Sequence, residues 1–340
     1  MKKKGFTLVE LLVVIAIIAL LMGILMPALA RVRMIAYRMV CGANLSGIGK
    51  ALLLYAGDNQ EAYPMPGVGP LTPIYCASKN IPSYYGFTAG DAAGAFSPTT
   101  SHGGRASIGS VFYMLVKYQD VSPKQFNCKG DSGSEIFKTS SVPGASTQTD
   151  LTKLYDFGDN PGKYNSYSYH FPFSKNATKG EAGFPVSVNS KPNAPLAADR
   201  SPAFDKNAAS YLSCDGTTAG GALGAAALAS SASLPYRDWA TPNNNEYKDK
   251  DFVYNSASHQ REGQNVLFND GHVTFSNTAN VGVDNDNIYQ KMPVTPTSLP
   301  KKDKEVGGTF PVGRPQASGN YLQYVPTDSE ESLLINEYNP

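Results

Sequence analysis

One carboxylate, Glu10, stands at the edge of the most apolar stretch of the chain, where a charged side chain needs a partner. Lysines occupy positions 2 to 4, and Glu10 is followed by LLVVIAIIALLMGILMPALA, twenty residues without a charge. An acidic side chain at the centre of a membrane helix costs about 2.5–3.5 kcal/mol, and less toward the ends. We therefore expect a positive charge to be delivered to Glu10.

Four cysteines could form covalent bonds: Cys41, Cys76, Cys128 and Cys214. An even number of cysteines in an exported chain permits two disulfides, with three alternative connectivities. None of the four has CxxC spacing, which argues against a zinc cage. Free thiols are the alternative to disulfides.

A short acidic segment, DNDN at 284–287, alternates oxygen donors as calcium-binding loops do. Asp284 and Asp286 are the candidate calcium ligands. The segment lacks the glycine and the downstream glutamate of an EF-hand, so an exposed Asx-turn is the alternative.

Residues 130–133 (GDSG) are similar to the nucleophile loop of chymotrypsin-like proteases. Ser134 and Glu135 depart from that pattern, and His102 lies only thirty residues upstream, too close for a two-barrel protease. A Ser/His/Asp triad needs an aligned base and orienting group. A polar turn after Cys128 is the simpler interpretation, and no enzyme is predicted.

The elements that must position these residues begin with the apolar run. Leu11–Ala30 would be about 30 Å long as a helix, which is the thickness of the hydrocarbon core of a membrane. Pro27 is expected to kink or loosen this helix. Beyond Arg31 the apolar residues recur every three or four positions, as on one face of an amphipathic helix: Leu45, Ile48, Leu52 and Tyr55. One helix is predicted over residues 6–58, with residues 6–30 apolar all round.

Two ordinary interpretations of the apolar run compete. A secretory signal peptide could be cut after Ala28-Leu29-Ala30, but the run is longer than the usual apolar region of such peptides. A plain single-span anchor is the second. Its orientation is not set by the basic residues, because they flank both ends: Lys2, Lys3, Lys4, Arg31, Arg33 and Arg38.

Residues 59–340 are predicted to form a globular head built on an antiparallel β-sheet, which gives an α+β fold. The clearest element is a hairpin over residues 265–275 (NVLFNDGHVTF), because Asn269-Asp270-Gly271 suits a tight turn. Tyr164–His170 and Pro195–Asp199 are expected strands. Ile108–Val116 fits either a short helix or a strand.

Two parts of the head carry little pattern. Residues 216–233 are an Ala/Gly/Ser-rich insertion, which is either a loop or a small helix. The last fifty residues are rich in proline and are expected to wrap the head or to extend as a tail. The formal net charge of +1 does not indicate nucleic-acid binding. The 20 tyrosines against 1 tryptophan are typical of loop-rich β structure outside the cytoplasm.

The string KGFTLVE, from Lys4 to Glu10, closely resembles the leader of type IV pilins and type II secretion pseudopilins. The resemblance implies a leader peptide of residues 1–5, cut by prepilin peptidase between Gly5 and Phe6, with methylation of the new amine of Phe6. It also implies that Glu10 pairs with the Phe6 amine of a neighbouring subunit during assembly, and that Pro27 is the mid-helix proline of the family. Major pseudopilins often bind calcium near the C-terminus, which favours the Asp284/Asp286 site.

The segment HQREGQNVLFNDGHV, from His259, resembles the H-X9-DG C-terminal segment of a large subclass of prepilin-like proteins. Ten residues, not nine, separate His259 from Asp270. The subclass is also similar at CGANLSGIGKALLLYAGDNQEAYP (41–64), SYSYH (166–170) and PLAADR (195–200). We expect Gly271 to make the turn, Asp270 to bond backbone within it, and His259 to cap or pack. A metal-binding or catalytic role of this pair is the alternative.

Together these residues predict a structural filament subunit, for which calcium is the one candidate cofactor. The expected partners are copies of itself or other pilins, the prepilin peptidase, an inner-membrane assembly platform and membrane lipid. The precursor is expected to span the bacterial inner membrane once with an extracytoplasmic head, and to join a periplasmic or surface filament afterwards. The rival prediction is a membrane-anchored extracytoplasmic module that binds glycans through its many tyrosines.

Overall fold

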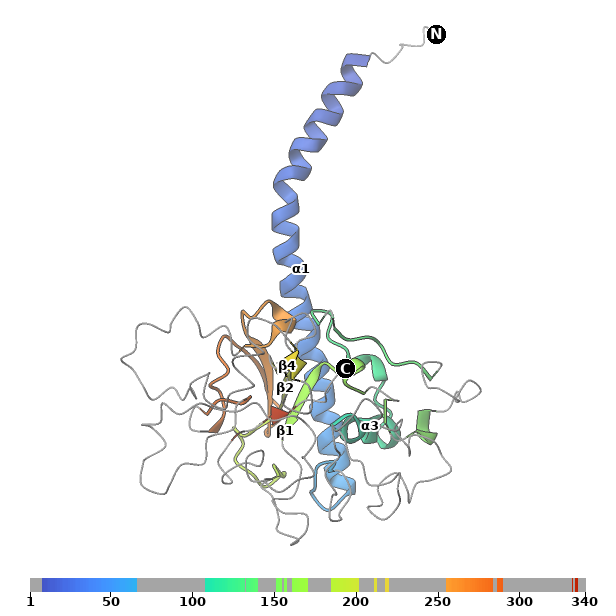
Figure 1. Ribbon diagram of the computed structural model, residues 1–340, viewed down its shortest axis with the longest axis vertical. Helices are drawn as coiled ribbons and strands as arrows, with labels where there is room; N and C mark the ends of the chain where they lie inside the picture. The colour runs from blue at the N-terminus through green and yellow to red at the C-terminus, as the bar shows by residue number, and fades with distance from the viewer. Residues whose placement is uncertain are drawn as a thin grey trace, which may run out of the picture.

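The computed structural model describes thirteen segments of the chain: residues 8–65, 108–131, 133–139, 151–154, 156–157, 161–170, 185–201, 211–212, 218–219, 255–283, 286–289, 332 and 334–335. A long helix and an antiparallel sheet dominate these segments (Figure 1). The predicted α+β class is confirmed.

Helix α1 covers Leu8–Asp58 and contains 51 residues, about 77 Å of helix. Its first half projects from the head as a gently curved stalk, and its second half is enclosed by the head (Figure 1). The predicted one-sided pattern is confirmed there, since the buried side chains include Leu45, Ile48, Leu52 and Tyr55.

Helix α1 ends in a left-handed cap. Gln60 and Glu61 have positive φ angles of 55° and 63°, and the amide of Glu61 donates to the carbonyl of Ala56 at 2.8 Å. The Asn59 side chain donates to the carbonyl of Tyr55 at 2.8 Å. These bonds use carbonyl groups that the helix end leaves without partners.

The main sheet has five antiparallel strands in the order β6-β5-β2-β1-β7. The strands are β1 (Tyr167–His170), β2 (Pro195–Asp199), β5 (Gln264–Phe268), β6 (Val273–Ser276) and β7 (Leu334–Ile335). The predicted hairpin is β5–β6, and Gly271 in its turn has a φ of +87°, which favours glycine. The last fifty residues therefore contribute an edge strand, β7, to the sheet.

Smaller elements complete the described part of the head. Helix α3 covers Ile108–Tyr118, so this segment is a helix and not a strand. A separate two-stranded ribbon pairs β3 (Tyr211–Leu212) with β4 (Thr218–Ala219). Short 3₁₀ turns occur at η1 (Pro123–Phe126), η3 (Leu151–Lys153), η4 (Pro161–Lys163) and η8 (Ala257–His259). Most of the 216–233 insertion lies outside the described residues.

The head core lies around the second half of α1, which packs against strands β5 and β6 and against α3. Gly49 allows the close approach to β5, because a Cβ atom there would lie 2.7 Å from Leu267 Cδ1. Four of the tyrosines are fully buried: Tyr113, Tyr167, Tyr169 and Tyr289. These four rings belong to the core of the head and are not available to a glycan.

Candidate functional site

The stalk carries the residues that the leader motif singles out. Among the described residues, α1 is the one helix long and apolar enough to cross a membrane. Its large apolar side chains are exposed from Leu8, which is 77% exposed, to Val40, except that Met34 and Tyr37 are half-buried. Such a surface needs lipid or other apolar helices around it.

The structure describes two of the four predicted stalk residues, Glu10 and Pro27. Glu10 is exposed in the first turn of α1, where a carboxylate interacts favourably with the helix dipole. Pro27 lies inside α1, and the helix continues through it. Gly5 and Phe6 lie outside the described residues.

A disulfide fastens the stalk to the head where α1 enters it. Cys41 of α1 bonds to Cys128, 87 positions later in the chain and just after η1, and both residues are buried. Closing a loop of this size stabilises a fold by roughly 4–5 kcal/mol in the chain-entropy account. Cys76 and Cys214 lie outside the described residues.

A buried histidine–carboxylate pair adjoins this disulfide. His259 Nε2 lies 3.0 Å from Asp199 Oδ2, and both side chains are fully buried. The same nitrogen lies 3.8 Å from the sulfur of Cys128. Asn265 donates to Asp199 Oδ2 from its backbone amide at 2.6 Å and from its side chain at 3.0 Å. The carboxylate is therefore held by three nitrogen atoms.

The pairing of β2 with β5 creates this arrangement. Ala198 is opposite Val266 in the register, so Asp199 at the end of β2 comes next to Asn265. The turn η8 brings His259 to the same place, and the hydroxyl of Ser256 caps it by accepting from the amide of Ser258. Residues from four separate parts of the chain thus meet at one point.

Gly130 lets the segment after Cys128 lie against η8. A Cβ atom at this position would lie 2.1 Å from the carbonyl oxygen of Ser258 and 3.1 Å from His259 Nδ1. The first distance is far below any real contact, so only glycine fits without a backbone shift.

The neighbouring Asp131 holds parts of the head together. It forms an ion pair with Arg200 at 3.1 Å, and both side chains are at most 7% exposed. Arg200 also donates to the carbonyl oxygens of Gly162, at 2.7 Å, and of Asn165. Asp131 Oδ1 accepts from the amide of Gly133 at 2.9 Å. The pair thus ties β2 to two loops of the head.

His259 and Asp270 do not meet. Asp270 is 44% exposed in the β5–β6 turn, where it pairs with His272 and accepts from the His272 amide at 3.0 Å. This backbone hydrogen bond is the main cause that lowers the pKa of Asp270 below its ordinary value. His259 is instead buried beside Asp199. A joint chemical role of His259 and Asp270 is not what this geometry offers.

The candidate calcium residues are only partly described. Asp286 is buried, and its Oδ2 accepts from the backbone amide of Ser332 at 2.6 Å, which anchors the segment that leads to β7. Asp284 lies outside the described residues. Calcium binding here stays a prediction.

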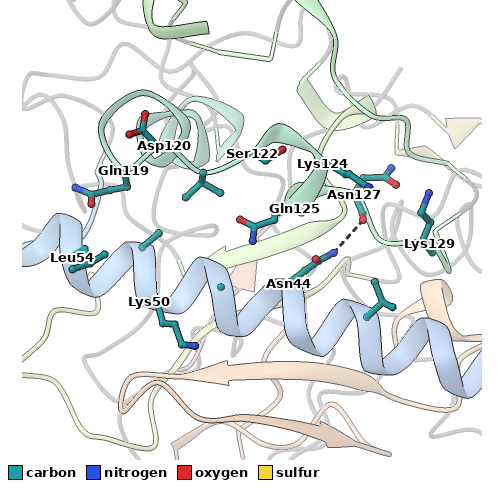
Figure 2. A pocket seen from close by; sticks show the side chains of 14 residues that line it. Asn44, Lys50, Leu54, Gln119, Asp120, Ser122, Lys124, Gln125, Asn127 and Lys129 are labelled. Atoms are coloured by element: carbon teal, nitrogen blue, oxygen red, sulfur yellow. Dashed lines mark hydrogen bonds between the residues drawn. The ribbon is translucent and has the colours of Figure 1, made fainter.

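A groove of about 490 Å³ lies between α1 and residues 119–129. In Figure 2 the side chain of Gln125 points toward α1, and Asn44 of α1 donates to the carbonyl of Asn127 at 3.4 Å. Gly47 makes room for Gln125, whose Nε2 would lie 2.9 Å from a Cβ atom there. Its lining includes the lysines Lys50, Lys124 and Lys129 together with amide side chains.

Sequence reasoning did not find Asp199, Asn265 or Arg200 as members of the buried cluster. The available signals were a strand that ends in a carboxylate and the PLAADR segment. Neither signal identifies a partner, because the contacts of Asp199 with His259 and Asn265 join residues 60 or more positions apart, and those of Arg200 with Gly162 and Asn165 join residues 38 and 35 positions apart.

Residues 1–26 match the family model of the prokaryotic N-terminal methylation motif. The motif indicates a pilin-type protein that is processed by prepilin peptidase. No curated protein and no solved structure matches the chain.

Proposed function

We propose that this chain is a structural subunit of a filament of the type IV pilus or type II secretion pseudopilus class. The observation that carries the proposal is a stalk of exposed apolar side chains, Leu8 to Val40, that begins within the methylation motif of residues 1–26. In the precursor the stalk would lie in the inner membrane. In the filament, stalks of neighbouring subunits would replace the lipid.

Glu10 is proposed to fix the register between neighbouring stalks. It is the one carboxylate of the stalk before Asp58, and it lies in the first turn of α1. The amine of Phe6 on a neighbouring subunit would be released by cleavage after Gly5. A desolvated ion pair is costly to break from one side, so subunits would dock only where the two charges meet.

The junction between stalk and head supports a rigid subunit with its head outside the cytoplasm. Besides the disulfide, Arg38 forms an ion pair with Glu262 and lies 4.6 Å above the ring of Phe275. Disulfides form and persist in oxidising compartments. The Cys41–Cys128 bond therefore favours an extracytoplasmic head.

Processing is tested by intact mass after expression with and without a prepilin peptidase. We expect the peptidase to remove residues 1–5 and to add one methyl group to the new N-terminus. Gly5→Leu should abolish both changes. Gly23→Leu is the matched control, because nothing lies within 4 Å of a Cβ atom there. A mature chain that starts at unmethylated Met1 or at Arg31 contradicts the proposal.

Assembly is tested separately with Glu10→Gln in a cell that carries the assembly machinery. We expect normal processing but a loss of sheared or purified filaments, because the Phe6 amine loses its acceptor. Glu135→Gln changes an exposed glutamate of the head and should leave assembly unchanged. Normal filaments from the Glu10 variant would remove the proposed role of this carboxylate.

A further inference from the structure

Four side chains that commonly bind transition metals meet at the stalk–head junction. They are Cys41, Cys128, His259 and Asp199, and one donor atom from each lies within 4.8 Å of all the others. All four residues are at most 1% exposed. A disulfide alone would need neither the histidine nor the carboxylate, and burying these two groups is costly.

We propose that, when Cys41 and Cys128 are reduced, these four side chains bind one zinc-like divalent ion. The stalk–head junction would then have two forms in which Cys41 and Cys128 stay linked, a disulfide form and a metal form. They exclude one another, because the thiolate and not the disulfide is the metal ligand. The inference is independent of the filament role.

The distances suit a tetrahedral ion. Bonds of about 2.3 Å to sulfur and about 2.0–2.1 Å to nitrogen or oxygen give ligand–ligand edges of roughly 3.3–3.8 Å. The sulfur of Cys128 lies 3.8 Å from His259 Nε2, at the upper end of this range. This nitrogen lies 3.0 Å from Asp199 Oδ2, so an ion between them needs this pair to part by roughly 0.3 Å. The Cα atoms of the two cysteines are 5.4 Å apart, so parting the sulfurs needs side-chain rotation and not a new fold.

The surroundings of the carboxylate resemble the outer shell of a metal site. Asn265 donates twice to Asp199 Oδ2 and thereby fixes its orientation. Asp199 Oδ1 is buried and has no hydrogen-bond partner among the residues that the structure describes. His259 Nδ1 is also buried and has no hydrogen-bond partner among the described residues. The disulfide form thus leaves buried polar atoms unsatisfied at this point.

The two forms are linked by a balanced exchange. A dithiol reductant gives two electrons and two protons to the disulfide, and is itself oxidised to a disulfide. The ion then displaces one proton from each cysteine thiol, and both protons go to the buffer. Two thiolates, one carboxylate and a neutral imidazole surround the ion. Either form closes the same loop between α1 and the head.

Cobalt titration of the full chain in detergent tests the proposal. The variant Cys76→Ser/Cys214→Ser leaves Cys41 and Cys128 as the available thiols, and a phosphine reduces the disulfide. We expect one Co²⁺ per reduced chain, with thiolate-to-cobalt charge-transfer absorption and the visible bands of a tetrahedral ion. The oxidised chain should show neither.

Variants identify the ligands. His259→Ala and Asp199→Asn should each weaken cobalt binding at least about tenfold, since even outer-shell changes cost that much. His272→Ala is the matched control, because His272 is 48% exposed in the β5–β6 turn, and should leave binding unchanged. The proposal is overturned if the reduced chain binds no cobalt, if the oxidised chain binds it equally, or if the His259 variant binds like the parent.

Folding provides a second readout if reduction unfolds the head. Zinc should then restore the far-ultraviolet circular dichroism of the reduced parent, because metal binding is coupled to folding. It should not do so for His259→Ala. A reduced parent that stays unfolded at saturating zinc also overturns the proposal.

Discussion

Asp199 is a fully buried acidic side chain that several hydrogen-bond donors surround. It accepts from both nitrogens of Asn265 and pairs with His259, while its backbone carbonyl accepts from the hydroxyl of Tyr289 at 2.7 Å. In the disulfide form this carboxylate is a structural acceptor. It stabilises the fold by accepting hydrogen bonds from these donors, because a buried donor without an acceptor costs free energy.

Replacing this carboxylate should therefore destabilise the head strongly. Asp199→Ala removes the acceptor of His259 and of the Asn265 backbone amide, and one acceptor of the Asn265 side chain, so we expect a loss of about 2–4 kcal/mol in the free energy of unfolding. Urea unfolding of the oxidised chain in detergent measures it. Asp270→Ala, at an exposed pair, should cost less than about 1 kcal/mol. Equal losses for both variants would contradict the central position of Asp199.

The contacts of Asp199 with His259 and Asn265 join distant parts of the chain and were not predictable from the sequence. The Asp270-Gly271 turn was predictable, because it depends on local features. These are a glycine with positive φ and a carboxylate that accepts from the amide two residues later. The spacing from His259 to Asp270 suggested one unit, whereas His259 turns inward at η8 and Asp270 faces solvent. The pairing of Cys41 with Cys128 likewise depends on which segments the fold brings together.

At the scale of elements, local pattern predicted more. The bounds of Pro195–Asp199 coincide with β2, and the helix predicted over residues 6–58 is observed over Leu8–Asp58. The strand expected over Tyr164–His170 begins only at Tyr167, because Pro161–Lys163 forms a 3₁₀ turn before it and Asn165 bonds to the backbone of Tyr167. The order of the strands was not predictable, since it depends on long-range pairing.

The contact between the segment after Cys128 and η8 gives a sharp test of how elements are joined. Gly130→Ala forces a Cβ atom against the Ser258 carbonyl, so we expect a loss of stability of about 2 kcal/mol or more. Gly57→Ala is the matched control in α1. Nothing lies within 4 Å of a Cβ atom there, and alanine is the better helix former by about 1 kcal/mol.

Thermal unfolding of the two variants against the parent decides the matter. The midpoint should fall for Gly130→Ala and should hold or rise for Gly57→Ala. Parent-like stability of the Gly130 variant would mean that the segment after Cys128 does not lie against η8.

At the scale of the whole molecule, the tyrosine-rich core makes the head sensitive to alkali. Burial raises the pKa of Tyr167, Tyr169 and Tyr289 well above the ordinary 10.0, and the charge of Asp199 raises those of Tyr167 and Tyr289 further. In the unfolded chain these phenols ionise near their ordinary pKa. Their neutral form therefore stabilises the fold fully below pH 10, and this stabilisation is lost as the pH rises toward the folded pKa values.

We expect the thermal midpoint to be flat up to about pH 10 and to fall above it, with the tyrosinate absorbance of the buried phenols appearing together with unfolding. Tyr169→Phe removes one of the buried phenols, so its midpoint should fall less steeply with pH, although it starts lower because the hydrogen bond to the Pro64 carbonyl is lost. Tyr118→Phe, at an exposed position, is the control. Identical slopes for the Tyr169 variant and the parent would contradict the expectation.

The position of the Cys41–Cys128 bond also has a mechanical consequence. The exposed part of α1 before it is a lever about 50 Å long, and Cys41 is the first fully buried residue along that lever. A sideways force on the stalk produces its greatest bending moment at Cys41, where α1 enters the head. Separation of the helix from β5 and β6 would start at this point. The disulfide at this point transmits the force to the segment after η1. We therefore expect α1 to bend or lose its helical structure before it separates from the head.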